Sequence, residues 1–201
     1  MNNQKRKAAP LALLAVASLL LAGCTSAAGA GGHGSHGAGH GSSEGTSHSA
    51  PGSAPANAPS EASLMVCGGQ VKGNLVKILK LDAEPSTSDN WANSTYDCTY
   101  QLADGDLAVS VQEASDQASA LKYFDAMQAL AVGATPIKGL ASLGFPAYET
   151  PDGSVVFQKD SMILHVDASD LPAAFGPDKV TPTAFAYQVA TIVLACWTEH
   201  T

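Results

Sequence analysis

The sequence predicts an α+β domain, in which an antiparallel sheet of about five strands carries three helices packed mainly on one face. Apolar residues recur at helical spacing in three segments, and five short segments between them have the length and residue pattern of strands. Adjacent short segments are joined by tight turns, which favour antiparallel pairing. We therefore expect one globular domain, over residues 64–201.

The first helix is expected over residues 69–81, where apolar residues return every three or four positions. A polar loop over residues 82–93 should follow it, and Trp91 is an aromatic residue among the polar ones there. Trp91 has two interpretations of similar weight, a ligand contact at the surface or an anchor packed on the core. The buried stripe of the helix should comprise Val71, Leu75, Ile78 and Leu79.

Two strands joined by a tight turn are expected next. In each of them apolar residues alternate with polar ones, which is typical of a strand with one buried face. Residues 103–106 form the turn between them. The inward positions should be Tyr96, Cys98, Tyr100 and Leu102 in the first strand and Leu107, Val109 and Val111 in the second.

The middle helix is expected over residues 116–132, with Ser115 as its N-cap and Gly133 after its end. A segment without regular structure should follow over residues 136–144. The predicted buried stripe of this helix is Ala120, Leu121, Phe124, Met127 and Ala131.

The last three strands are expected near residues 146–150, 154–158 and 162–168. The final helix should begin at Pro182, because the fixed φ of proline suits the first helical position. Thr181 precedes it as the N-cap. The predicted buried stripe of this helix is Phe185, Val189, Ile192, Val193 and Cys196.

An export signal is predicted over residues 1–23. Residues 5–7 are all basic, and the apolar run that follows is shorter than the roughly 20 residues that span a bilayer core. The run ends in Leu21-Ala22-Gly23-Cys24, which resembles the lipobox of bacterial lipoprotein signal peptides. The resemblance implies cleavage before Cys24 and lipid on that cysteine, which holds the protein on the extracytoplasmic face of the cell membrane.

A disordered tether is predicted over residues 24–63. After Cys24 this segment is rich in Gly, Ala, Ser, His and Pro and has no large apolar side chain. Such a composition buries too little surface to offset the entropy lost on ordering. A flexible chain of 39 residues reaches about 35 Å on average, enough to lift a small domain clear of the headgroups.

The charge balance argues against a nucleic-acid partner. The whole chain has a formal charge of −8, and removal of residues 1–23 leaves seven basic residues, none of them arginine, against eighteen acidic residues. Phosphate backbones and anionic headgroups are bound by clusters of Lys and Arg. We therefore expect no nucleic-acid binding and no second, electrostatic attachment to lipid.

The domain has three cysteines, Cys67, Cys98 and Cys196. Disulfides persist outside the cytoplasm, so we expect one disulfide and one remaining thiol. A bond between Cys67 and Cys98 would tie the start of the first helix to the first strand, and it is the pairing that we favour. A bond from either of them to Cys196, on the stripe of the last helix, stays open.

Four of the six histidines, His33, His36, His40 and His48, lie in the predicted tether. Imidazoles at spacings of three and four residues can chelate Zn²⁺, Cu²⁺ or Ni²⁺. A flexible segment would have to be ordered on binding, so such a site would be weak and unselective. Metal binding by the tether is therefore an alternative hypothesis, beside a spacer without a ligand.

Catalytic machinery is not expected. Ser119-Ala120-Leu121-Lys122 and Ser88-Asp89-Asn90 match motifs of serine acyl-transfer enzymes, but their order along the chain is reversed and the K-T-G motif is missing. His165 and His200 are the histidines of the domain, and no nucleophile elbow accompanies them. Phosphate-loop, dinucleotide and EF-hand motifs are missing too. We expect neither an enzyme nor a resident cofactor.

Several features of the chain occur together. They are the lipobox, the tether, Val66-Cys67-Gly68-Gly69 at a helix start, the strand Tyr96-Asp97-Cys98-Thr99-Tyr100 and the final Cys196-Trp197. In these the chain resembles small cell-wall lipoproteins of high-GC Gram-positive bacteria, the DUF3558-type lipoproteins, and more distantly extracellular sensor domains of receptor kinases. The family has no assigned reaction or site residues.

The expected role is a non-enzymatic binding or sensory module at the cell surface. Its partners would be the membrane, through lipid on Cys24, and a protein or small ligand that the sequence does not identify. We expect binding through the loops at residues 82–93 and 136–146, because loops on a rigid frame are common contact sites.

Overall fold

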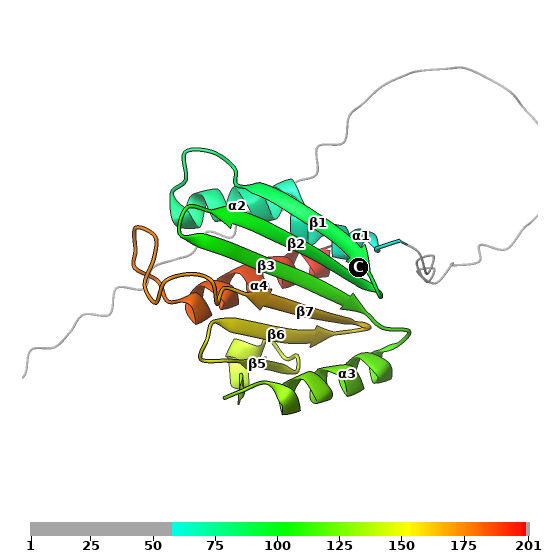
Figure 1. Cartoon of the computed structure of the whole chain (residues 1–201). Coiled ribbons are helices and arrows are strands. Elements are labelled where there is room, and N and C mark those ends of the chain that lie inside the picture. Colours follow the sequence, from blue (N-terminus) through cyan, green and yellow to red (C-terminus); the bar gives the residue numbers. More distant parts are fainter. Residues whose placement is uncertain (1–57, 200–201) are drawn as a thin grey trace, which may run out of the picture. The chain divides into compact units, whose positions relative to one another are not determined.

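Seven strands form one antiparallel sheet in residues 58–199, the part of the chain that the computed structural model describes, and helices cover both faces (Figure 1). The helical elements are α1 (Glu61–Leu64), η1 (Met65–Cys67), α2 (Gly69–Leu79), α3 (Gln117–Leu130), η2 (Gly139–Ser142) and α4 (Pro182–Glu199). The strands are β1 (Ser86–Ala92), β2 (Thr95–Leu102), β3 (Gly105–Glu113), β4 (Thr135–Pro136), β5 (Ala147–Glu149), β6 (Ser154–Lys159) and β7 (Met162–Asp167).

The strand order is β1-β2-β3-β7-β6-β5-β4, and every neighbouring pair is antiparallel. The predicted α+β class is therefore confirmed, whereas the sheet has seven strands and not about five. The two additional strands are its edges. β1 occupies most of the predicted polar loop, and β4 is a two-residue strand at the start of a segment predicted to be irregular.

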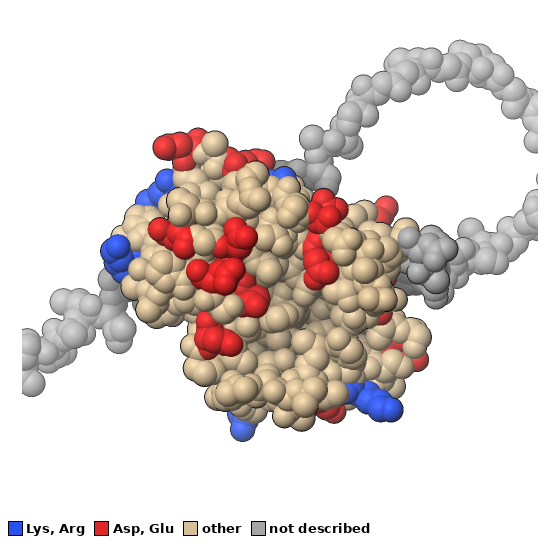
Figure 2. All heavy atoms as spheres, in the orientation of Figure 1, with Lys and Arg blue, Asp and Glu red and all other residues tan. Residues whose placement is uncertain are grey.

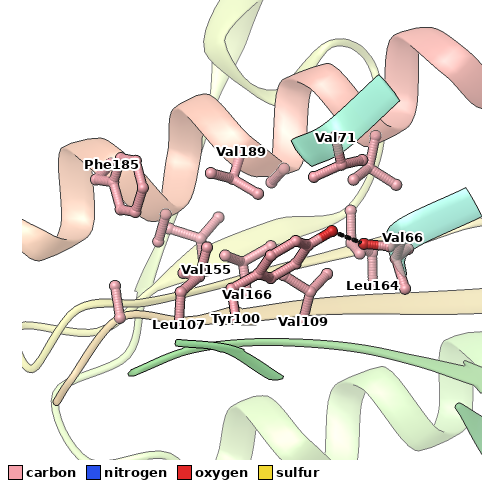
Figure 3. Close-up of a cluster of buried hydrophobic side chains, with 14 of the residues drawn as sticks. Val66, Val71, Tyr100, Leu107, Val109, Val155, Leu164, Val166, Phe185 and Val189 are labelled. Atoms are coloured by element: carbon pink, nitrogen blue, oxygen red, sulfur yellow. Dashed lines mark hydrogen bonds between the residues drawn. The ribbon is translucent and has the colours of Figure 1, made fainter. Parts of the chain in front are cut away.

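The main core lies between the sheet and the helices α2 and α4 (Figure 3). The alternation predicted for the first two strands is confirmed, because their inward residues, including Tyr100 and Val109, are buried on this face. Figure 3 shows the hydroxyl of Tyr100 donating a hydrogen bond to the carbonyl oxygen of Val66. The long strand β2 is thereby joined to the segment that leads into α2.

The helix α3 packs on the opposite face of the sheet, so the prediction that three helices share mainly one face is wrong for this helix. Its Ala120 and Phe124 are buried in a second, smaller cluster. The ring centroids of Phe124 and Tyr148 lie 5.3 Å apart there. The strand β6 is buried on both faces as a result. Its run Val155-Val156-Phe157 is continuous rather than alternating, as expected for a strand covered on both sides.

The ends of α3 differ from the prediction by a few residues. Asp116, not Ser115, is the N-cap, and its carboxylate accepts a hydrogen bond of 2.7 Å from the Ser119 amide. That bond holds the pKa of Asp116 below its usual value. Leu121, predicted in the buried stripe, is exposed because only a narrow strip of the helix meets the sheet.

Folded structure begins before residue 64, where the sequence predicts the end of the tether. Ser63 is buried in α1, and its hydroxyl and the Ser60 amide both donate to the carboxylate of Glu113. The indole Nε1 of Trp197 donates to the Ala62 carbonyl at 2.9 Å. This segment is fixed by hydrogen bonds rather than by large apolar side chains, so its composition gives no sign of order.

The predicted disulfide between Cys67 and Cys98 is present, with a Cα–Cα distance of 5.6 Å. It joins the 3₁₀ turn η1 to the middle of β2, beside the main core. Cys196 is a buried cysteine outside this bond. The predicted pairing is therefore confirmed.

Among residues 58–199, the structure contains no helix with the length and apolar composition that a bilayer crossing requires.

Candidate functional site

An open groove of about 700 Å³ lies beside the first turns of α4, at the edge of the sheet where β5 and β4 pair. One wall is the helix, the floor is the edge of the sheet, and the other wall is the connection that contains η2. The lining residues are Ile137, Ala141, Glu149, Val180, Thr181, Thr183, Ala184, Tyr187 and Gln188.

The helical wall follows from the local sequence of α4. Pro182 opens the helix, and the Thr181 hydroxyl accepts a hydrogen bond of 3.3 Å from the Ala184 amide, which confirms the predicted N-cap. Ala184 and Tyr187 are three residues apart, so they lie on the same side of the helix. The small side chain of Ala184 leaves room in front of the Tyr187 ring.

The floor of the groove is set by the register of β5. Glu149 pairs with Val155 of β6, and paired residues of an antiparallel sheet point to the same face. Val155 is fully buried in the main core beneath α4. The side chain of Glu149 therefore lies on the α4 face, at the edge where the helix no longer covers the sheet.

Direct hydrogen bonds fix the two walls relative to each other. The Tyr187 hydroxyl donates to the Ala141 carbonyl at 2.8 Å, across the groove from helix to connection. The Thr183 hydroxyl donates to the Thr150 carbonyl at 3.3 Å, which joins the helix to the end of β5. The groove is therefore formed in the folded domain without a ligand, and the hydroxyls of Thr183 and Tyr187 are already engaged.

Glu149 is the charged residue of this lining. It is half-buried, and within residues 58–199 its carboxylate has no hydrogen-bond or ion-pair partner. The two ion pairs of the described chain, Lys80 with Asp178 and Lys159 with Asp160, do not involve it. A single negative charge thus stands at the base of a mostly apolar groove.

The two segments predicted as contact loops lie in different parts of the structure. Trp91 lies in β1 opposite Tyr96, half-buried against the main core, so it is an anchor of the edge strand. The loop at residues 136–146 does contribute Ile137 and Ala141 to the groove. Glu149 and Tyr187 were not predicted, because neither has a distinctive sequence context. The one available signal is that Tyr187 is an aromatic residue off the buried stripe of its helix.

The two serine motifs do not come together. Ser119 and Lys122 are exposed on α3, which packs on β6 and β7. Ser88 and Asn90 lie on β1, the strand at the far edge of the sheet. The arrangement agrees with the interpretation of both motifs as chance matches.

A second hollow, of about 260 Å³, lies on the face of the sheet opposite the main core. It is acidic, and Figure 2 shows acidic side chains gathered over this part of the molecule. Among the described residues no group of His, Cys, Asp and Glu has an arrangement that could hold a metal ion. The hollow is lined by Thr99, Asp106, Ala108, Asp167, Ser169 and Asp170.

The carboxylate of Asp167 in this hollow is held in its charged form. Burial alone would raise its pKa, but the Ser169 amide donates to Oδ1 at 2.9 Å and His165 lies nearby. Together these contacts keep the pKa of Asp167 below its usual value.

His165 should make the domain less stable in mild acid. Burial lowers its pKa below 6.5, and this effect outweighs the attraction of a proton by Asp167, Asp152 and Asp97. Near pH 6.5 the unfolded chain therefore binds more protons at this residue than the folded chain does. Its contribution to stability is complete above about pH 6.5 and is lost as the pH falls towards the folded pKa.

The measurement is urea unfolding of the wild type and a His165→Gln variant between about pH 7.5 and about pH 5.5. We expect the wild type to lose more stability than the variant over this range. A wild type that gains stability relative to the variant on acidification would contradict the lowered pKa.

Comparisons of the chain with protein-family models, with curated proteins and with solved structures find no match. The remaining predicted site residues, Cys24 and the four histidines of the tether, lie outside the described residues. The groove beside α4 has a size and a largely apolar lining that are typical of a ligand site.

Proposed function

We propose that the protein is a lipid-anchored lipoprotein of the extracytoplasmic membrane face, and that its domain is a non-enzymatic binding module. The observation that carries the binding role is the preformed groove beside α4, whose volume of about 700 Å³ falls in the usual range of small-ligand sites. Its threonine and tyrosine hydroxyls are engaged in wall contacts, which suits a binding surface better than a nucleophile.

The disulfide supports the extracytoplasmic location. Disulfides form and persist in oxidising compartments and are rare where thiols are kept reduced. The bond between Cys67 and Cys98 ends on a fully buried residue of the core strand β2, so it is part of the folded structure rather than a surface modification. Export also agrees with the predicted signal and with the resemblance to small cell-wall lipoproteins.

The anchor is tested by a Cys24→Ser variant, followed by labelling with a radioactive fatty acid and membrane fractionation. We expect the variant to lose the label and to leave the membrane fraction, because lipid on residue 24 is the proposed attachment. A Cys196→Ser variant is the matched control, and it should stay labelled and membrane-bound. A labelled, membrane-bound Cys24→Ser protein would contradict the proposal.

A metal-binding lipoprotein remains the second candidate. The observation that favours it is the set of four histidines at close spacing in one segment, His33, His36, His40 and His48. Native mass spectrometry of the full chain with Zn²⁺ or Cu²⁺ separates this role from binding in the groove, because only the histidine segment would then take up the ion.

A further inference from the structure

We propose that the groove beside α4 binds a small cationic amphiphile, that is, one ammonium group on an apolar body. The inference rests on the proposed binding function and adds the chemical class of the ligand. It starts from two facts, an apolar lining and one carboxylate without a partner among the described residues.

The lining requires an apolar body. Ile137, Val180 and Ala184 present aliphatic carbon to the groove, and the Tyr187 ring adds an aromatic surface. A ligand gains affinity there chiefly by removing this surface from water. The hydroxyls of Thr183 and Tyr187 already donate to carbonyl oxygens of the walls, so they offer no free donor to a strongly polar ligand.

The carboxylate of Glu149 favours a ligand with a positive charge. A neutral ligand that filled the groove would remove water from this half-buried carboxylate and give nothing in return, which opposes binding. An anionic ligand would add repulsion to that cost. A cation replaces the lost water by an opposite charge, so the site discriminates among ligands of equal apolar size.

Tyr187 strengthens the preference for a cation. Its ring lines the groove, and its hydroxyl is fixed on the Ala141 carbonyl, which keeps the ring in place. The ring centroid of Phe157 lies 6.3 Å from that of Tyr187, so Phe157 supports the tyrosine ring from the core side. A cation near the face of a tyrosine ring is attracted by the ring quadrupole, and carboxylate and aromatic ring act in the same direction.

The test uses the Cys24→Ser variant of the full chain. This variant carries no lipid on residue 24, so it needs no detergent that would compete with the probes. Backbone amide shifts of Ala184, Tyr187 and Glu149 are followed by NMR during titration with three probes of equal chain length. The probes are octyltrimethylammonium, 1-octanol and octyl sulfate, each kept below its micelle concentration. We expect the ammonium probe to bind roughly tenfold more tightly than the alcohol, and the sulfate to bind most weakly.

Variants assign the effect to its residues. Glu149→Gln should lower the affinity for octyltrimethylammonium roughly tenfold and leave the affinity for 1-octanol unchanged or higher. Glu84→Gln is the matched control, because Glu84 is an exposed carboxylate in the segment between α2 and β1. Ala184→Phe should abolish binding of all three probes, since it fills the groove from an exposed helix position.

The outcomes separate the ligand class from the proposed function. Equal affinity for the ammonium and alcohol probes, or an unchanged affinity of Glu149→Gln, overturns the cationic class and leaves the groove as an apolar binding site. Absence of shifts at the groove amides with every probe overturns both the ligand class and the assignment of the binding function to this groove.

Discussion

Replacing Cys98 by alanine in the oxidised protein is expected to lower the free energy of unfolding by about 3–4 kcal/mol. The disulfide joins residues 31 positions apart in the sequence, and a closed loop of this length strongly limits the unfolded chain. The bond also holds η1, which leads into α2, against the middle of β2. The measurement is urea unfolding without reductant, with the fraction folded followed by circular dichroism.

Cys196→Ala is the matched control for that experiment. Cys196 is also buried but lies outside the disulfide, so the variant should lose only about 1 kcal/mol from a trimmed core side chain. Reductant should destabilise the wild type and Cys196→Ala, and it should leave Cys98→Ala unchanged. Equal losses for the two variants in oxidising buffer would contradict the assigned role of the bond.

Trp197→Ala is expected to lower the free energy of unfolding by about 3–5 kcal/mol, the usual cost of removing a large buried aromatic side chain. Trp197 is 2% exposed on α4 and packs in the main core. Its indole also donates to the Ala62 carbonyl, so it holds the first turn of the domain against the last helix. Urea unfolding gives the loss directly.

A Trp197→Phe variant separates packing from the hydrogen bond. It keeps an aromatic ring in the core and removes the donor to Ala62, so the loss should be about 1–2 kcal/mol. Amide hydrogen exchange should then rise in α1 before it rises in the sheet. A loss below about 1 kcal/mol for Trp197→Ala would show that the first and last segments do not depend on this contact.

The elements that the sequence predicted well are those with one buried face and one exposed face. β2 and β3 alternate cleanly because their outer face meets solvent, and α4 has a wide apolar stripe because it covers the sheet along its length. β1 could not be predicted from periodicity. Trp91 is the one large apolar residue of this edge strand, and the Ser, Thr, Asp and Asn residues around it give no alternating pattern.

The packing of α3 on the second face of the sheet accounts for the two-sided burial of β6. The apolar run in β6 contained that information, because a strand covered on both faces does not alternate. The sequence does not tell which helix covers which face. In the structure β7 lies between β3 and β6, and α3 covers the outer face of β6 and β7.

The groove was beyond sequence prediction for a related reason. Glu149, Ala141 and Tyr187 are far apart along the chain and meet only because β5 lies at the edge beyond β6, where α4 begins to leave the sheet. No motif links such residues. The segment at residues 136–146 could be predicted as a contact segment only because it has neither a helical nor a strand pattern.

Mass spectrometry of the protein extracted from membranes of the producing cell tests the central claim most directly. The claim is that an exported domain, closed by one disulfide, is held to the membrane by lipid on Cys24. A non-reduced digest should contain an amino-terminal peptide that begins at Cys24 with the added mass of lipid, together with a peptide pair joined through Cys67 and Cys98. An unlipidated peptide that spans residues 23 and 24, or a crosslink that includes Cys196, would contradict it.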